Sequence, residues 1–364
     1  MKIGVHKIAM AAPNDVSGLK ALIDAGAVDP ASIVAVIGKT EGNGGANDFT
    51  RGFATLSFQL LLAPLLGTTP DDVGARIAFV WSGGTEGVLS PHATIFTRVP
   101  GVPAQTPRLA LGIAVTRELA AEEIGRMAMV EVVADAVRRC LADTGITDPS
   151  AVHYVQVKGP LLTPARITEA RARGAALATE DPNGSKTYAR GAMGLGVALG
   201  LGEVSGADLS DAVIARRLDL FSSVASTSAG GELKNCEVLL FGNSASAGGD
   251  LRIGHAVLAD AIDADGVRAA LASAGLDVSA SVGREDAGRI AAVFAKAEAS
   301  PTGKIRGWRN TMLSDADINY ERHARAALGA VIASVTNDPA IFVSGGTEHQ
   351  CAPGMAPIAA IVRV

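Results

Sequence analysis

The chain has 364 residues, a formal net charge of -5 and 48% hydrophobic residues, of which few are aromatic. This length exceeds the usual size of one domain and predicts about two or three folding units with a large buried core. Mild acidity without long charge runs argues against a nucleic-acid or anionic-membrane partner and favours a small-molecule substrate. The 42 glycines among many Ala, Val, Leu and Ile residues are typical of an α/β protein rich in turns.

The ends of the chain and its cysteines bear on its compartment. The N-terminus has no apolar stretch of signal-peptide length, and no segment approaches the roughly 20 apolar residues of a membrane span. Three cysteines, Cys140, Cys236 and Cys351, are an odd number without CxxC spacing. We therefore expect a cytoplasmic protein without a disulfide framework or a zinc motif.

One pattern of elements recurs three times along the chain, which is the signature of internal repeats. Each pass begins with an apolar strand, continues with a helix that stops at a glycine, and closes with a second apolar strand ending in lysine. These segments lie at residues 3–39, 110–158 and 251–296. The closing lysines are Lys39, Lys158 and Lys296.

The second half of each pass is shared as well. An arginine precedes a helix of small apolar residues, and a strand then runs into a serine followed by small residues. The arginines are Arg51, Arg190 and Arg325, and the serines are Ser82, Ser228 and Ser344. We predict three homologous α/β repeat units over residues 1–103, 108–247 and 251–364, joined by Gly/Pro/Ser-rich linkers.

A lysine at the end of a buried strand is costly, because the strand interior offers its charge no solvation. For a single lysine, a flexible stem that reaches solvent is the simpler interpretation, just as a lone Ser-Gly-Gly is usually a turn. Three lysines and three serines at matching repeat positions favour a shared site instead. The Ser17 to Lys20 stretch has SxxK spacing, but it lies on an amphipathic helix without partner motifs.

These residue types suit acyl transfer. A desolvated lysine amine can take the proton of a serine hydroxyl, which then attacks a carbonyl. Small residues after each serine, namely Gly83, Ala229 and Gly345, leave backbone N–H groups free to face an oxyanion. Arginine forks suit a compact, carbonyl-rich and partly anionic substrate.

Long stretches of the sequence resemble the cyanuric acid hydrolase and barbiturase family of ring-opening amidohydrolases. They include VIGKTEGNGGANDFTR, FVWSGGTEGVLSPH, VQVKGPLLTPARI, YARGAMGLG, SVASTSAGGEL, VFAKAEASPTG, TMLSDADIN and VSGGTEHQ, and they span the whole chain. The resemblance implies three units around a pseudo-threefold axis. We expect a central β-barrel-like core with helices outside and the active site at its centre.

The resemblance also implies roles for the site residues. Ser228 would be the nucleophile and Lys158 its base. The remaining pairs, Lys39 with Ser82 and Lys296 with Ser344, would bind and polarise ring carbonyls with help from the three arginines. Cyanuric acid would open to carboxybiuret, or barbiturate to ureidomalonate, without an organic cofactor.

The family further implies a homotetramer and a structural Mg²⁺ or Ca²⁺ ion in the third unit. The candidate metal ligands are the acidic side chain of Glu298 and nearby backbone carbonyls in the segment from Thr347 to Met355, namely those of Thr347, Gln350, Cys351, Ala352 and Met355. The segment from Thr347 to Met355 is less rich in glycine than its relatives, and its alternative interpretation is a structural loop.

Two questions stay open at the level of sequence. Cyanuric acid is the first candidate ring and barbituric acid the second; Asn319, Tyr320 and Glu321 lie where that preference would be tuned. A protein that binds small cyclic metabolites without turnover would keep the arginines and serines but would not need an activated lysine.

Overall fold

The computed structural model describes the whole chain, from Met1 to Val364. Its strands form three four-stranded sheets and one short hairpin. The first sheet contains β1 (Lys2–Ala9), β2 (Ile33–Thr40), β3 (Ala78–Gly83) and β4 (His92–Val99). The second contains β5 (Arg108–Val115), β6 (Val152–Pro160), β7 (Ala225–Gly230) and β8 (Glu237–Ser244). The third contains β9 (Leu251–Leu258), β10 (Ile290–Ala297), β13 (Phe342–Gly345) and β14 (Ala356–Arg363), and the hairpin pairs β11 (Lys304–Ile305) with β12 (Trp308–Arg309).

The three sheets share one topology. In the first sheet the order is β1-β4-β2-β3, with β4 antiparallel to both neighbours and β2 parallel to β3. The second and third sheets repeat this order and these directions. The sequence pattern had predicted three strands in each pass and missed β4, β8 and β14. These strands are almost wholly buried and therefore lack the alternation that marks a half-exposed strand.

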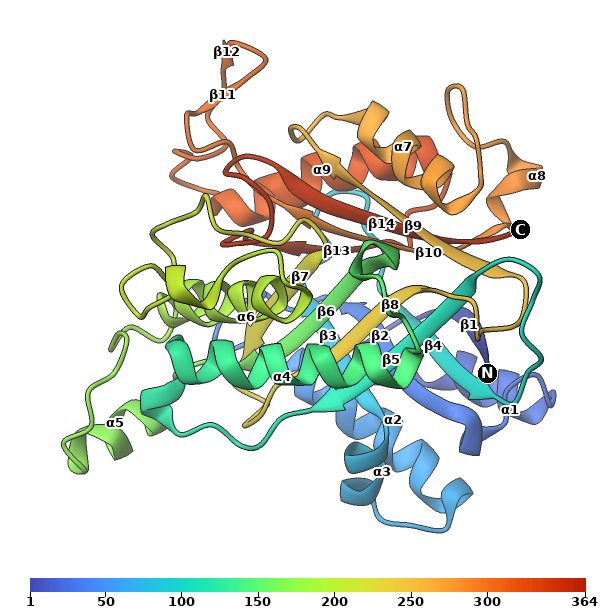
Figure 1. The fold of residues 1–364 in the computed structure, drawn as a ribbon, viewed down its shortest axis with the longest axis horizontal. Coiled ribbons are helices and arrows are strands. Elements are labelled where there is room, and N and C mark those ends of the chain that lie inside the picture. Colours follow the sequence, from blue (N-terminus) through green and yellow to red (C-terminus); the bar gives the residue numbers. More distant parts are fainter.

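Helices cover the outer faces of the sheets (Figure 1). The first sheet carries α1 (Ser17–Asp24), α2 (Thr50–Leu66) and α3 (Pro70–Arg76). The second carries α4 (Met127–Thr144), α5 (Pro164–Ala172) and α6 (Ser185–Leu201), and the third carries α7 (Ala264–Ala274), α8 (Arg284–Ala287) and α9 (Tyr320–Thr336). Short 3-10 turns occur at η1 (Pro30–Ser32), η2 (Ala121–Glu123), η3 (Pro149–Ala151) and η4 (Gly206–Asp208).

Four apolar clusters hold these layers together. Three of them fill the space between one sheet and its own helices. The fourth gathers the inner faces of all three sheets, and its centre is a group of aromatic rings around Phe294. Because this central cluster belongs to every sheet, none of them can bury its inner face alone.

The expected β-barrel-like core is wrong. The three sheets are open and separate, and one isolated bridge joins Lys2 of the first sheet to Gly248 in the segment between β8 and β9. A closed barrel requires an unbroken hydrogen-bond ladder around the ring. Here the sheets meet through side chains. Lysine ammonium groups donate hydrogen bonds to backbone carbonyls of the edge strands β3, β7 and β13, in place of a ladder to a further strand.

No single helix is long and apolar enough to cross a membrane. Helices α2 and α3 meet the length and composition criterion only together, as a pair bent by 98°.

Candidate active site

The repeated lysines and serines occupy the same register in every sheet. The lysines lie on β2, β6 and β10, and each is the register partner of the serine on the parallel edge strand beside it, which is β3, β7 or β13. The opposed pairs are Lys39 with Ser82, Lys158 with Ser228, and Lys296 with Ser344. All six residues are buried, and adjacent strands lie about 4.8 Å apart. The strand pairing therefore brings together residues 43 to 70 positions apart in sequence.

The first and third pairs are hydrogen-bonded. Lys39 Nζ donates to Ser82 Oγ at 3.1 Å, and Lys296 Nζ donates to Ser344 Oγ at 3.2 Å. Each of these two serines therefore accepts a hydrogen bond from the lysine of its own unit.

The middle pair is arranged differently. Lys158 Nζ lies 3.1 Å from Glu232 Oε1 and donates to the backbone carbonyl of Trp81 at 3.2 Å. Ser228 Oγ is buried and has no hydrogen-bond partner. An unpaired buried hydroxyl is uncommon in proteins and marks a position where a substrate group can complete the bonding.

Each lysine also reaches into another sheet. Its ammonium donates to the carbonyl of the residue that precedes that sheet's serine. The three bonds are Lys39 to Val343 O at 2.7 Å, Lys158 to Trp81 O at 3.2 Å, and Lys296 to Thr227 O at 2.8 Å. They form a closed cycle that joins the first sheet to the third, the second to the first, and the third to the second.

Three glutamates complete the arrangement, and the sequence analysis missed them. Each lies four residues after a repeated serine and pairs with the arginine of another unit. The guanidinium Nε contacts are Arg51 Nε to Glu232 Oε1 at 3.0 Å, Arg190 Nε to Glu348 Oε2 at 2.7 Å, and Arg325 Nε to Glu86 Oε2 at 2.8 Å. The signal that could have found them is the shared spacing in SGGTE, SAGGE and SGGTE.

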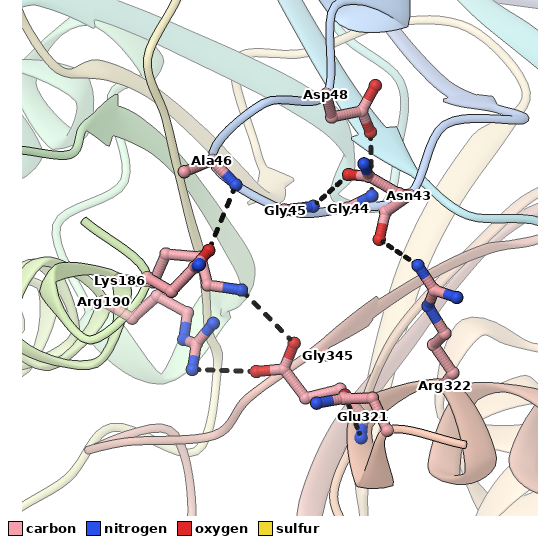
Figure 2. Close-up of polar contacts among 12 residues, drawn as sticks. Asn43, Gly44, Gly45, Ala46, Asp48, Lys186, Arg190, Glu321, Arg322 and Gly345 are labelled. Carbon is pink, nitrogen blue, oxygen red and sulfur yellow. Dashed lines mark hydrogen bonds and ion pairs between the residues drawn. The ribbon is translucent and has the colours of Figure 1, made fainter. Parts of the chain in front are cut away.

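A small polar cavity, about 30 Å³ in volume, lies where the three sheets meet. Its lining contains ten of the predicted site residues: Arg51, Ser82, Gly83, Lys158, Arg190, Ser228, Ala229, Arg325, Ser344 and Gly345. Lys39 and Lys296 do not line this chamber, but they donate hydrogen bonds to Ser82 and Ser344, which do. Three further lining residues, Gly44, Lys186 and Glu321, come from the segments that surround the opening in Figure 2.

Burial controls the protonation of the lysines. It lowers the pKa of Lys296 to about 7 and the pKa of Lys39 well below its usual value. Burial also lowers the pKa of Lys158, although the Glu232 carboxylate opposes this effect. A pKa near 7 leaves a large fraction of Lys296 as neutral amine at neutral pH, and the lowered pKa of Lys158 shifts it in the same direction, toward the form that a general base requires.

The arginines stay charged and are held in place by carboxylates. Burial alone would lower the pKa of Arg190, but Glu348 and Glu321 raise it well above the usual value. Arg190 Nη2 lies 3.0 Å from Glu321 Oε1, in addition to its paired contact with Glu348. A fixed guanidinium beside the chamber can polarise a carbonyl group without rearranging.

The predicted metal ligands do not form a side-chain cage. Glu298 Oε2 accepts hydrogen bonds from the backbone N and Oγ1 of Thr347, and Gln350 Oε1 accepts from Thr227 N at 2.6 Å. Burial raises the pKa of the Cys351 thiol to about 12, so this group stays protonated, and Met355 is partly exposed. Hard cations prefer several converging oxygen ligands, and these side chains alone do not supply them, so the predicted site depends on the backbone carbonyls and stays a prediction.

Other candidate groups lie elsewhere. Ser17 and Lys20 are exposed on α1, where they contact Asp15 and Asp24 respectively. His349 is buried; its Nδ1 lies 2.6 Å from Leu220 O and its Nε2 accepts from Ala215 N, a structural role. Asn319 and Tyr320 precede Glu321 at the start of α9, outside the chamber lining.

Known proteins resemble this chain in sequence and in overall fold. A cyclic amide hydrolase of Azorhizobium caulinodans is 69% identical over 366 residues, with 100% of both chains covered. A cyanuric acid amidohydrolase of Bradyrhizobium diazoefficiens is 54% identical and covers 100% of this chain and 98% of its own. A solved cyanuric acid hydrolase, described as an evolutionary innovation by structural concatenation, superposes with a TM-score of 0.95 at 49% identity, covering 100% of this chain and 99% of its own.

A protein family described as amidohydrolase ring-opening protein matches residues 4–363. This match covers all three sheets, the chamber and every predicted site residue. The chain therefore belongs to the ring-opening amidohydrolase family.

Proposed function

We propose that this protein hydrolyses a cyclic imide by a serine mechanism, with Ser228 as the nucleophile and Lys158 as the base. Cyanuric acid, opened to carboxybiuret, is the first candidate substrate. The observation that carries the proposal is the chamber lining, which contains all three repeated serines but only one of the repeated lysines, Lys158, and in which only the Ser228 hydroxyl has no partner.

In the first step, neutral Lys158 accepts the hydroxyl proton as Ser228 Oγ bonds to a ring carbonyl carbon. Backbone N–H groups beside Gly83, Ala229 and Gly345 are close to the chamber and suit a developing oxyanion. The C–N bond then breaks, and Lys158 returns the proton to the leaving nitrogen. Water hydrolyses the resulting ester, again with Lys158 as base, and regenerates Ser228.

Barbituric acid is the second candidate. The 69% identical relative is named for cyclic amides in general, whereas relatives at 48–54% identity are named for cyanuric acid. The names therefore leave the ring open. A side-by-side assay of ring opening on the two compounds decides between them.

The same proposal extends to the rest of the molecule. The common sheet topology, the opposed lysines and serines and the cyclic contacts support three repeat units around a pseudo-threefold axis, with boundaries near 1–103, 108–247 and 251–364. We further propose a cytoplasmic homotetramer that needs no organic cofactor. The mechanism routes no step through a metal ion.

Replacing either member of the catalytic pair tests the mechanism. Ser228→Ala and Lys158→Ala should each reduce kcat by about 10⁴-fold or more, because the nucleophile or its base is lost. Ser17→Ala and Lys20→Ala are the matched controls, since both residues are exposed on α1, and they should behave as wild type. Retained turnover in Ser228→Ala would assign the attack to Ser82 or Ser344 instead.

A further inference from the structure

Ring opening creates a difficulty that the chamber alone does not solve. The nitrogen released from the carbonyl stays tethered to the ester on Ser228, at the end of the opened chain. Tethered groups react with effective molarities of about 10⁵–10⁸ M when they are well oriented. The freed nitrogen therefore competes strongly with water and closes the ring again unless it is held away from the ester.

A second cavity next to the chamber offers such a place. It is open to solvent, has a volume of about 400 Å³ and has no apolar side chain in its lining. We call it the vestibule; it is formed by Asn43, Gly44, Gly45, Asn47, Asn183, Lys186, Asn319, Glu321, Arg322 and Arg325. Figure 2 shows segments from the three parts of the chain around this opening.

Four residues line both cavities and so form a neck between them: Gly44, Lys186, Glu321 and Arg325. Lys186 and Glu321 lie one helical turn before Arg190 and Arg325, on the same helix faces. Lys186 Nζ is 3.8 Å from Glu321 Oε2, across the gap between α6 and α9. Helix α2 begins only one residue before Arg51, so the first part of the chain contributes a glycine loop there instead.

The vestibule contains three asparagines whose carboxamide nitrogens are free to donate hydrogen bonds to a ligand. Asn47, Asn183 and Asn319, one from each predicted repeat unit, each use the carboxamide oxygen to accept a protein N–H. Their carboxamide nitrogens have no acceptor in the protein. Arg322 uses only Nη2, which donates to Asn43 O at 3.1 Å. Such a set favours a ligand with several carbonyl oxygens.

We propose that the vestibule is a subsite for the carbonyl-rich, ureide-type arm of the ring-opened acyl-enzyme. The arm passes through the neck, its carbonyl oxygens accept from Arg322 and the asparagine carboxamides, and Glu321 accepts from its N–H groups. This rests on the proposed function. Holding the arm there separates the freed nitrogen from the Ser228 ester, so that water reaches the ester first.

The acyl-enzyme has two fates, reclosure and hydrolysis, and each step conserves atoms and electrons. Opening forms the Ser228 Oγ–C bond, breaks one ring C–N bond and leaves the hydroxyl proton on the freed nitrogen. Reclosure reverses all three changes and regenerates the substrate and the free serine. Hydrolysis adds water across the ester, giving the linear acid and the free serine. The vestibule changes only the partition between these two fates of one intermediate.

The test measures that partition with hydroxylamine, which attacks the ester and competes with reclosure. The probe substrates are cyanuric acid and barbituric acid, and the variant is Arg322→Ala combined with Asn183→Ala, both exposed positions. In the variant, hydrolysis should fall about tenfold while hydroxylamine restores most of the substrate consumption. In wild type, hydroxylamine should change the product but hardly change the rate of consumption. Arg309→Ala, an exposed arginine on β12 outside both cavities, is the matched control and should behave as wild type.

The hydroxylamine experiment distinguishes failure of the vestibule subsite from failure of the proposed serine mechanism. Equal partition in wild type and the double variant, with a hydroxylamine adduct formed in both, would overturn the vestibule subsite and leave the serine mechanism intact. Ring opening without any hydroxylamine adduct would contradict the acyl-enzyme, and with it the proposed function.

Discussion

At the scale of single residues, the three Lys–Ser pairs share a register but differ in protonation and bonding. Lys158 is set apart because carboxyl groups lie on two sides of it. Glu232 lies 3.1 Å from its ammonium, and Glu237 is its register partner on β8. Burial raises the pKa of Glu237 to about 8, so this neighbour is largely protonated at neutral pH. The carboxylate of Glu232 is therefore the main charge that tunes Lys158.

Removing that charge should change the pH profile in a defined direction. The Glu232 carboxylate raises the pKa of Lys158, so Glu232→Gln lets that pKa fall. The base acts as a neutral amine, and its activity is lost as the pH drops through the pKa. The acidic limb of kcat/KM should therefore move to lower pH, by about one unit, with a lower plateau because the base is weaker.

Glu86→Gln is the control for this profile. Glu86 occupies the equivalent position after Ser82 but pairs with Arg325 and has no contact with Lys158. Its variant should keep the acidic limb of the wild type even if substrate binding weakens. A limb that shifts equally in both variants would mean that Glu232 does not set the pKa of the catalytic base.

The residue scale also shows what the sequence could predict. Opposed lysines and serines follow from the repeat, because matching positions on neighbouring parallel strands must meet. The contacts between units do not follow from it. Glu232 pairs with Arg51, which lies 181 positions away in another unit, and no local pattern encodes that partner. The metal site stays a prediction; among its side chains, that of Gln350 is engaged with Thr227 of the second sheet, which no local pattern encodes.

At the scale of elements, the turn after β13 fixes an arginine of another sheet. Gly346 has φ +81°, a left-handed conformation that disfavours any residue with a Cβ atom. A Cβ at this position would overlap the guanidinium of Arg190. The glycine therefore serves two purposes: it allows the turn, and it lets Arg190 reach Glu348 beside the chamber.

Gly346→Ala should consequently impair catalysis as well as stability. The strained conformation costs roughly 1–2 kcal/mol, and displacement of Arg190 should reduce kcat/KM by about 10²-fold. Gly67→Ala is the matched control, because Gly67 has φ +62° at the end of α2 and open space around it. It should lower the thermal unfolding temperature similarly but leave kcat/KM unchanged. Equal kcat/KM values in the two variants would mean that Arg190 has no role in catalysis or substrate binding.

At the scale of the whole molecule, three sheets form one core without forming one barrel. The repeats predict the strand order. How the repeats join depends on which groups donate hydrogen bonds to the backbone carbonyls of their edge strands. Lysine side chains do so here, at Trp81, Thr227 and Val343. The same cycle places the chamber at the junction of all three sheets. A site built this way requires every unit to be folded and docked before any chemistry occurs.

The outer surface bears on assembly. Four large apolar residues, Phe49, Phe53, Leu56 and Leu60, follow helical spacing along α2 and its first flanking residue and are 46–82% exposed. We call them the α2 stripe. No charged residue occurs from position 52 to 66. Monomeric proteins rarely expose contiguous apolar patches of this kind, so the stripe supports contact with a second copy of the chain.

Sedimentation analysis tests the proposed homotetramer through this stripe. Wild-type protein should sediment as a tetramer, and Phe53→Ser combined with Leu60→Ser should shift it to a smaller species, because each buried side chain contributes about 1.5–3 kcal/mol. Trp308→Ser is the matched control, since Trp308 is 82% exposed on β12 and lies outside the stripe. A monomeric wild type would refute the tetramer, and a double variant that stays tetrameric would assign the interface to another face. If assembly only supports the fold, the smaller species should keep its kcat at low temperature, because one chain supplies Ser228, Lys158 and the three arginines of the chamber.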